Sequence, residues 1–156
     1  MLYDDNGRLL TRAIFWELSF PERRAKFPPL YTLGVVPAHG LPSAYQIYMS
    51  CVDEYEAGIK LMGNMKAWRQ LCSCDWFMNG DPRTGHEGLV QWRKDMEARD
   101  KSIAKQQLKV RAEKGSVPAM VKLYNITPAQ AKAVKKKVQE NPQDNKVVDI
   151  LKRMRE

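Results

Sequence analysis

A long helix is predicted by residues 85–114, whose sequence is GHEGLVQWRKDMEARDKSIAKQQLKVRAEK. Gly115 follows this stretch and Lys114 lies in its last turn, as the C-terminus of a helix prefers. Apolar residues recur in it every seven positions, at Leu89, Met96, Ile103 and Val110. A mainly α-helical fold is therefore expected for the chain.

The apolar stripe of this long helix is incomplete at its second heptad position. Trp92 occupies that position first, but Arg99 and Gln106 follow it. A seam that is apolar at one position and mixed at the other is weak for a coiled coil. It suits a helix that packs in a hairpin or against a neighbouring subunit, and an ordinary core helix is the alternative. The candidate oligomerisation residues are Leu89, Trp92, Met96, Ile103 and Val110.

Short basic helices are predicted after the long one. Val117–Tyr124 and Pro128–Val138 have the lengths of a helix-turn-helix pair, and Asn125 tolerates the left-handed backbone that the turn needs. Thr127 is a suitable N-cap for the second helix. A helix pair that only closes the core is the alternative. A last amphipathic helix is expected to bury Val147, Ile150, Leu151 and Met154.

The residues before the long helix predict three short helices, which could be a helix-turn-helix unit or a small packed bundle. The bundle is favoured because the local charge is not basic. Ser43 is a good N-cap for the first helix. Asp53 and Glu56 resemble a capping box at the start of the second, and Gly63 ends it. The third helix is expected to run from Met65 through Trp76 to Phe77.

An extended N-terminal arm is expected over residues 1–42, because four prolines between residues 21 and 37 break any regular element after a short helix at Thr11–Leu18. The arm is expected to pack on another surface through its aromatic residues, and in a ring or dimer that surface could belong to a neighbouring subunit. Four regions result: the arm, a small helical bundle, a long helix with a short return helix for oligomerisation, and basic C-terminal helices. They cover residues 1–42, 43–79, 85–125 and 126–156.

Positive charge is concentrated in the back half of the chain. Residues 1–91 hold nine Lys/Arg and ten Asp/Glu, a balance of −1, whereas residues 92–156 hold seventeen and eight, a balance of +9. Clustered positive charge attracts polyanions and releases counterions when it neutralises phosphates, although a solvated basic face is the alternative. The candidate DNA-binding residues are Lys105, Lys109, Arg111, Lys114, Lys132, Lys135, Lys136 and Lys137.

The chemistry of these residues favours sequence-tolerant binding. Lysines contact phosphates as point charges, whereas base edges are read by planar groups such as arginine, asparagine and glutamine. Gln130 is the main candidate for reading bases in the second helix of the pair. Phosphate contact is therefore the expected mode if DNA is bound.

Catalytic motifs are missing from the sequence. There is no Gly-x-x-x-x-Gly-Lys-Ser/Thr loop for nucleotides, and no motif pairs a cysteine or serine with His39 or His86. The carboxylates Asp53, Glu54 and Glu56 are explained by a helix start without a metal. We therefore expect a protein that is not an enzyme and needs no cofactor.

A zinc site built on the three cysteines is a weaker possibility. Cys51, Cys72 and Cys74 are odd in number and lack framework spacing, which indicates a reducing compartment. They could form a zinc site with His86, but the usual Cys-x-x-Cys pair is absent, so buried free thiols are the favoured interpretation.

A membrane association is not expected from the sequence. No stretch is long and apolar enough to cross a bilayer. Asp4, Asp5 and Arg8 interrupt the apolar run that a signal peptide would need.

Residues 31–77 carry a succession of motifs that resembles a known family. Tyr31-Thr32-Leu33 and Gly40-Leu41-Pro42-Ser43 precede Tyr45 and Tyr48. Asp53-Glu54-Tyr55 follows, and then come Trp68, Leu71, Cys72 and Trp76-Phe77. This order resembles the N-terminal block of small terminase subunits from tailed bacteriophages. The later long helix, Lys114-Gly115 turn and short helix extend the resemblance to residue 125, whereas the acidic tail of some members is basic here.

The resemblance implies a non-catalytic protein of viral genome packaging. Such subunits assemble into homo-oligomeric rings and recognise viral double-stranded DNA. They hand the DNA to a large terminase subunit, which holds the ATPase and nuclease, in the cytoplasm of the infected bacterial host. Two other classes stay open: a helix-turn-helix DNA-binding regulator, and a structural or adaptor protein whose basic tail balances an acidic partner.

Overall fold

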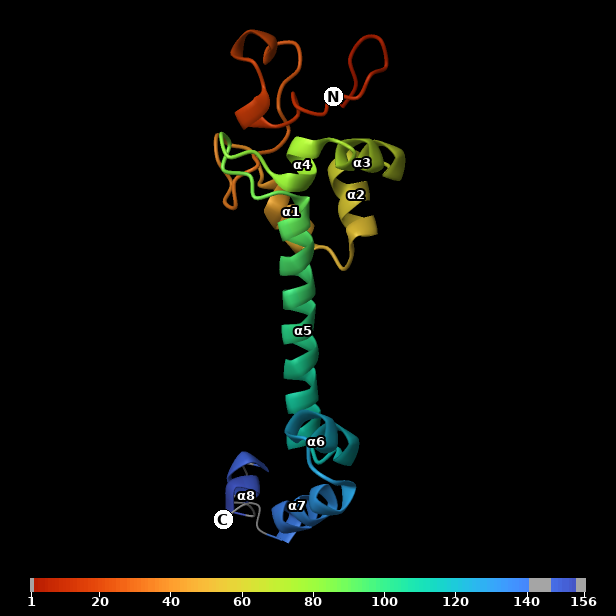
Figure 1. The fold of residues 1–156 in the computed structure, drawn as a ribbon, viewed down its shortest axis with the longest axis vertical. Helices are drawn as coiled ribbons and strands as arrows, with labels where there is room; N and C mark the ends of the chain where they lie inside the picture. The colour runs from red at the N-terminus through yellow and green to blue at the C-terminus, as the bar shows by residue number, and fades with distance from the viewer. Residues whose placement is uncertain (1, 141–146, 154–156) are drawn as a thin grey trace. The chain divides into compact units, whose positions relative to one another are not determined.

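The computed structural model describes residues 2–140 and 147–153, and within these ranges it is mainly α-helical, as predicted (Figure 1). Eight α-helices and two short 3₁₀-helices occur in the described ranges, where strand pairing is limited to isolated bridges. The chain divides into two compact units, Met1–Glu97 (unit 1) and Ala98–Glu156 (unit 2). The boundary falls inside helix α5 (Leu89–Glu113), and each unit has its own hydrophobic core.

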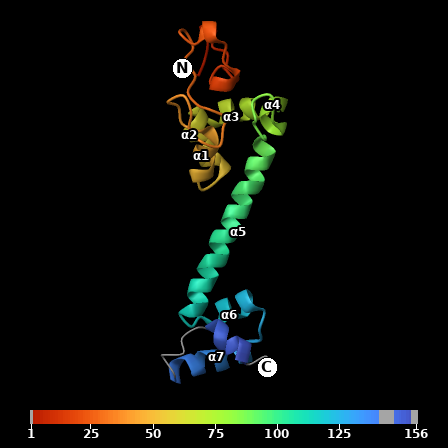
Figure 2. The same cartoon turned by 90° about the vertical axis from the view of Figure 1, so that its left-hand side faces the viewer.

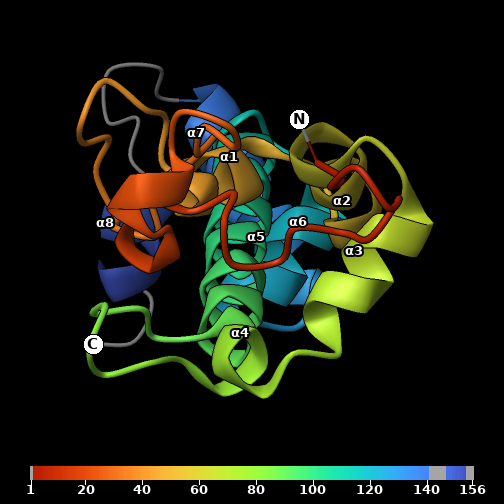
Figure 3. The same ribbon diagram turned by 90° about the horizontal axis from the view of Figure 1, so that it is seen from above.

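Unit 1 is built from four short helices and the first turns of α5. They are α1 (Ala44–Ser50), α2 (Glu54–Met62), α3 (Met65–Cys72) and α4 (Asp75–Asn79). Helix α2 packs on α1 (Figure 2), and it also packs on α3 (Figure 3). Aromatic rings fill the space between these helices: Trp68 lies edge-on to Phe77 at 5.7 Å and is stacked with Tyr48 at 6.3 Å.

The predicted starts of α1 and α2 and the predicted end of α2 are confirmed. The Ser43 hydroxyl accepts the Gln46 N–H at 3.2 Å, and the Asp53 carboxylate accepts the Glu56 N–H at 2.8 Å. The Glu56 carboxylate returns to accept the N–H of Val52 at 2.7 Å, one residue before the N-cap Asp53, so the arrangement resembles a capping box shifted by one residue at its return bond. Gly63 ends α2 in the left-handed region, with φ of +71°.

Two predicted boundaries are corrected by the structure. The single helix expected from Met65 to Phe77 is two helices, because Cys74 is extended (φ −80°, ψ 120°) and becomes the N-cap of α4. The long helix begins at Leu89 and not at Gly85, because Gly85 and Gly88 have left-handed φ values of +70° and +93°.

The N-terminal residues pack through an aromatic residue, and at Phe15 the packing partner is their own unit. Phe15 is 2% exposed and packs on Trp76 and Phe77, with ring centroids 5.9 and 6.0 Å away. The carboxylate of Glu17 accepts the N–H of Leu33 and the hydroxyl of Thr32, which ties the segment to itself. The helix expected at Thr11–Leu18 is reduced to the 3₁₀-helices η1 (Trp16–Leu18) and η2 (Pro21–Arg23).

Unit 2 contains the rest of α5 and three helices, α6 (Val117–Tyr124), α7 (Pro128–Glu140) and α8 (Val147–Arg153). Helix α7 packs on both α6 and α8. The predicted bounds of α6 and the start of α7 are confirmed, as is the burial of Val147, Ile150 and Leu151. Met154, expected in the same apolar face, lies outside the described residues.

Candidate functional site

The charge imbalance of the sequence coincides with the two structural units. Unit 2 holds fifteen Lys/Arg and six Asp/Glu, a balance of +9, and unit 1 holds eleven and twelve, a balance of −1. A surface with this excess concentrates anions near it. Unit 2 is therefore where a polyanion would be attracted.

The turn between α6 and α7 sets the position of the basic helix. Asn125 is left-handed (φ 52°, ψ 46°), as predicted, and Ile126 is 9% exposed and anchors the turn in the core of unit 2. The Thr127 hydroxyl accepts the Gln130 N–H at 3.3 Å, and the Gln130 amide oxygen accepts the Thr127 N–H at 2.9 Å. These reciprocal bonds fix the first turn of α7.

Gln130 has a structural role that the sequence interpretation overlooked. Its amide oxygen also accepts the hydroxyl of Thr127 at 3.1 Å, so the acceptor end of the side chain is held by the cap. A bidentate contact to adenine needs that oxygen together with the amide N–H group. The expected base-reading group of α7 is thus committed to helix capping.

The lysines of α7 are separated from its buried face. Ala131 and Val134 are fully buried, and Lys132, Lys135, Lys136 and Lys137 are exposed. The stem of Lys135 passes Gly115, since a Cβ built on that glycine would lie 3.7 Å from Lys135 Cε. This contact brings α7 beside the end of α5, whose exposed cationic residues are Lys105, Lys109, Arg111 and Lys114.

The expected oligomerisation stripe is corrected in its first half. Leu89, Trp92 and Met96 are 0%, 2% and 8% exposed and belong to the core of unit 1. The Trp92 ring lies 5.6 Å from Tyr45 and from Phe77. The ordinary core-helix alternative is therefore correct there. Only the second half of the stripe, Ile103 and Val110, is exposed, at 46% and 43%.

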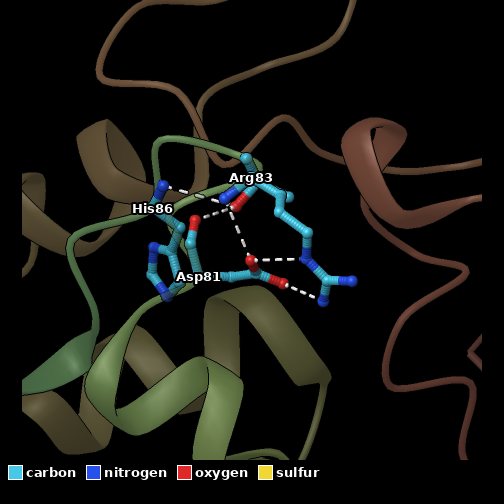
Figure 4. Close-up of polar contacts among 4 residues, drawn as sticks. Asp81, Arg83 and His86 are labelled. Atoms are coloured by element: carbon cyan, nitrogen blue, oxygen red, sulfur yellow. Dashed lines mark hydrogen bonds and ion pairs between the residues drawn. The ribbon is translucent and has the colours of Figure 1, made fainter.

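A polar cluster around the buried Asp81 of unit 1 was not predicted. In the loop between α4 and α5, the Asp81 carboxylate accepts the Arg83 guanidinium, with Nη2–Oδ2 2.8 Å and Nε–Oδ1 3.0 Å, and also the Arg83 backbone N–H (Figure 4). These bonds lower the pKa of Asp81 to about 2. The His86 N–H donates to the Thr84 hydroxyl at 3.3 Å. The three glycines at positions 80, 85 and 88 were the sequence signal for this loop.

His86 is enclosed by aromatic rings. Its side chain is 4% exposed, Nε2 is 3.1 Å from the Phe77 carbonyl oxygen, and the Phe77 and Trp92 ring centroids lie 5.4 and 5.1 Å away. Burial lowers the pKa of His86, which favours the neutral imidazole. With Nε2 donating to the carbonyl, the Nδ1 atom has no hydrogen-bond partner in the described structure. This geometry indicates a packing role.

A second unpredicted polar group joins three helices of unit 1. The Glu54 carboxylate accepts the Arg93 guanidinium with N–O distances of 2.7 Å and the Trp68 indole N–H at 3.2 Å. The hydrogen bond from Arg93 is the main reason why the pKa of Glu54 is lowered. Arg93 is thereby tied to the start of α2.

The zinc alternative is not supported by the geometry. The residues that the structure describes contain no group of three or more potential ligands placed to hold a metal ion. The Cys51 thiol donates to the Ile47 carbonyl at 3.1 Å, and His86 is held by Phe77. Burial raises the pKa of Cys72 to about 12, so its thiolate is disfavoured as a ligand.

None of the helices in the described ranges is long and apolar enough to cross a membrane. No protein-family model, curated protein or solved structure matches the chain.

Proposed function

We propose that this chain is the non-catalytic DNA-recognition and assembly subunit of a viral genome-packaging complex. In this role it forms a homo-oligomeric ring on double-stranded DNA and hands the DNA to a large terminase subunit with ATPase and nuclease activity. It acts in the cytoplasm of the infected bacterial host. The motif order at residues 31–77 supports the choice of family.

The observation that carries the DNA-binding part is the basic surface of unit 2. Unit 2 has a net charge of +9, and its α7 lysines lie next to the end of α5 through the contact of Lys135 with Gly115. All the cations exposed on α7 are lysines, and the Gln130 oxygen is used in the cap. Binding is therefore expected to be directed to phosphates and to tolerate different sequences.

The test is a charge reversal measured over a salt series. Fluorescence anisotropy with a labelled duplex compares the wild type with the double variant Lys135→Glu, Lys137→Glu between about 50 and 200 mM salt. Binding through phosphate contacts weakens steeply over this range, and the slope of log K against log salt is roughly proportional to the number of contacts. We expect the variant to lose at least about tenfold in affinity and to show a flatter dependence of log K on log salt.

The matched control is Lys66→Glu, which reverses an exposed lysine on α3 of unit 1. It is expected to leave the affinity close to that of the wild type. An unchanged affinity in the unit 2 variant would contradict the DNA-binding surface. A wild type that ignores DNA at low salt would leave only the structural or adaptor class.

A helix-turn-helix regulator is the second candidate, and the α6–α7 turn favours it. The left-handed Asn125, the buried Ile126 and the capped start of α7 give the compact helix pair of that motif. A regulator would prefer one sequence over random duplex by about 10³-fold or more. Selection from a random duplex library separates the two, because the packaging subunit is expected to show little enrichment.

A further inference from the structure

A cavity near the N-terminus of unit 1 takes no part in the proposed function. Its volume is about 410 Å³, and all its lining residues lie between Asp4 and Phe27. They come from two stretches of the chain, 4–13 and 18–27. Sites for small ligands are typically clefts or cavities of roughly 300–1,000 Å³. The cavity therefore has the size of a small-ligand site.

Apolar side chains from both stretches form a large part of the cavity wall. Leu9, Leu10 and Leu18 are partly buried and pack against the core of unit 1, which fixes their positions. Phe20 also lines the cavity and is 67% exposed. An apolar group in the cavity would cover Phe20 and the three leucines, and removing this apolar surface from water favours binding.

The two carboxylates of the wall already have partners. Asp4 Oδ1 accepts the backbone N–H of Asn6 at 2.9 Å and that of Arg8 at 2.8 Å. The Asp5 carboxylate forms an ion pair with Lys26, which comes from the other stretch of the wall. A cationic ligand would have to compete with these partners for either carboxylate.

The two arginines of the wall are not neutralised in this way. Within the described residues, neither Arg12 nor Arg23 forms an ion pair with a carboxylate. The guanidinium of Arg12 lies 5.8 Å from the Trp76 ring centroid, and the nearby Asp81 is held by Arg83. Three cations and two carboxylates line the cavity, which gives a balance of +1. This excess suits a ligand with a single negative charge.

A carboxylate fits this wall better than a phosphate group. A guanidinium binds either anion through paired N–H donors. A phosphate monoester, however, carries about −1.5 to −2 charges at neutral pH, and its second charge would face Asp4 and Asp5 in the same wall. Glu22, next to Arg23, is exposed and does not line the cavity.

We propose that this cavity binds a monocarboxylate with an apolar body. The carboxylate pairs with Arg23, and the apolar body lies on Leu9, Leu10 and Phe20. This chemistry occurs in free medium-chain acids and at the C-terminus of a polypeptide that ends in an apolar residue. The inference concerns unit 1 alone and does not rest on DNA binding or on assembly.

The test compares three ligands that share one alkyl chain: octanoate, 1-octanol and octylammonium. Saturation-transfer difference NMR over a concentration series gives the dissociation constant of each ligand for the full chain. Octanoate is expected to bind at least about threefold more tightly than octylammonium, because a like charge replaces an opposite charge at Arg23. Octanoate that does not bind, or binds no better than octylammonium, overturns the proposal.

Two variants of Arg23 locate the effect in the cavity. Arg23→Glu is expected to reverse the order of octanoate and octylammonium, and Arg23→Gln is expected to remove the difference. A damaged fold would weaken all three ligands and would not reverse their order. An unchanged order in Arg23→Glu overturns the assignment of the carboxylate to this arginine.

The matched control is Arg8→Glu. Arg8 is exposed in the same N-terminal segment and does not line the cavity, and its reversal changes the net charge of the chain by the same amount. This variant is expected to keep the order of the wild type. The same reversal in Arg8→Glu would mean that the charge of the whole segment selects the ligand, and it would overturn the cavity as the site.

A short peptide separates the two sources of such a carboxylate. Acetyl-leucyl-phenylalanine has a free carboxylate at its chain end, and its C-terminal amide is the control. Tighter binding of the acid than of octanoate, lost in the amide, assigns the site to a polypeptide C-terminus. Weaker binding of the acid than of octanoate assigns the site to a free acid. Either result supports the monocarboxylate site, whereas an amide that binds as tightly as the acid contradicts it.

Discussion

Unit 1 and unit 2 are stabilised by different kinds of core. Thirteen of the fourteen Phe, Trp and Tyr residues of the chain are in unit 1, and Tyr124 alone is in unit 2. The core of unit 1 is a network of rings, whereas the core of unit 2 is made of small and aliphatic side chains such as Ala112, Ala131 and Val134. Large rings each bury 150–250 Å², far more than alanine or valine.

The two units also differ in net charge, and the more highly charged unit has the smaller core side chains. The unit with the bulky core is nearly neutral, and the unit with the lean core carries a balance of +9. Like charges on a compact body repel one another and lower its stability. Unit 2 is therefore expected to be the less stable unit and to gain most from a bound polyanion, which is consistent with a surface kept for binding.

The largest effect is expected from removing a ring in unit 1. Trp68 is 1% exposed and packs on Tyr48 and Phe77, so Trp68→Ala should lower the free energy of unfolding of unit 1 by about 3–5 kcal/mol. Hydrogen exchange read by mass spectrometry should show faster exchange in α1–α4 and unchanged exchange in α6 and α7. The matched variant Met120→Ala in unit 2 should show the reverse. Loss of protection in both units from either variant would contradict two separate cores.

The loop that precedes α5 should be the next most sensitive place. Gly88 has a φ of +93°, and a Cβ on it would lie 2.6 Å from the Met78 carbonyl oxygen and 2.6 Å from the Gly80 nitrogen. Gly88→Ala combines this clash with backbone strain and should cost unit 1 about 2 kcal/mol or more in thermal or denaturant unfolding.

Gly85 supplies the control in the same loop. Its φ is +70°, but a Cβ there meets nothing within 4 Å. Gly85→Ala should therefore cost about 1–2 kcal/mol from the left-handed backbone alone. Equal losses at positions 85 and 88 would show that the close backbone approach at Gly88 carries no extra cost.

This loop also marks the limit of what sequence patterns predict here. Caps and stops such as Ser43, Gly63 and Asn125 were predicted because each needs only a residue type and its immediate neighbours. The start of α5 was missed because Gly85 and Gly88 act through a loop that closes on Asp81 and His86. Three glycines in nine residues carried that information, but helical periodicity outweighed it.

The same distinction between local signals and long-range packing applies to the candidate surfaces. Lysine positions on α7 could be predicted as exposed, since Ala131 and Val134 define the buried face of a helix. The burial of Trp92 and Met96 could not, because a seven-residue repeat does not say whether its partner is the same chain or another copy. Only the packing of unit 1 resolves that choice.

A smaller, pH-dependent effect is expected from His86. Burial among rings lowers the pKa of His86 below the value of about 6.5 of an unfolded chain, despite the opposing carboxylates of Glu17, Asp81 and Glu87. Between the two pKa values the unfolded state binds the proton and the folded state does not. The stability of unit 1 is then complete above about pH 6.5 and falls as the pH drops below it.

Tryptophan fluorescence measures this effect in unit 1 alone, because all four tryptophans lie there. At pH 5.5, one unit below the unfolded pKa, this histidine can remove at most about 1.4 kcal/mol. His86→Phe removes the titration and should flatten the stability profile between pH 5.5 and 7. An undiminished slope in that variant would exclude His86 as its source.

The smallest losses of stability are expected from removing an N-cap hydroxyl, a feature that occurs in both units. Thr127 is exposed and its hydroxyl accepts the Gln130 N–H, so Thr127→Ala should cost unit 2 about 0.5–1 kcal/mol. The Ser43 hydroxyl accepts the Gln46 N–H and also donates to the Gly34 carbonyl at 2.6 Å in a site that is 1% exposed. Ser43→Ala leaves that carbonyl unpaired and should cost unit 1 more, about 1–2 kcal/mol. Hydrogen exchange at the first turns of α1 and α7 measures both, and a larger loss at Thr127 would mean that burial in unit 1 adds nothing to its caps.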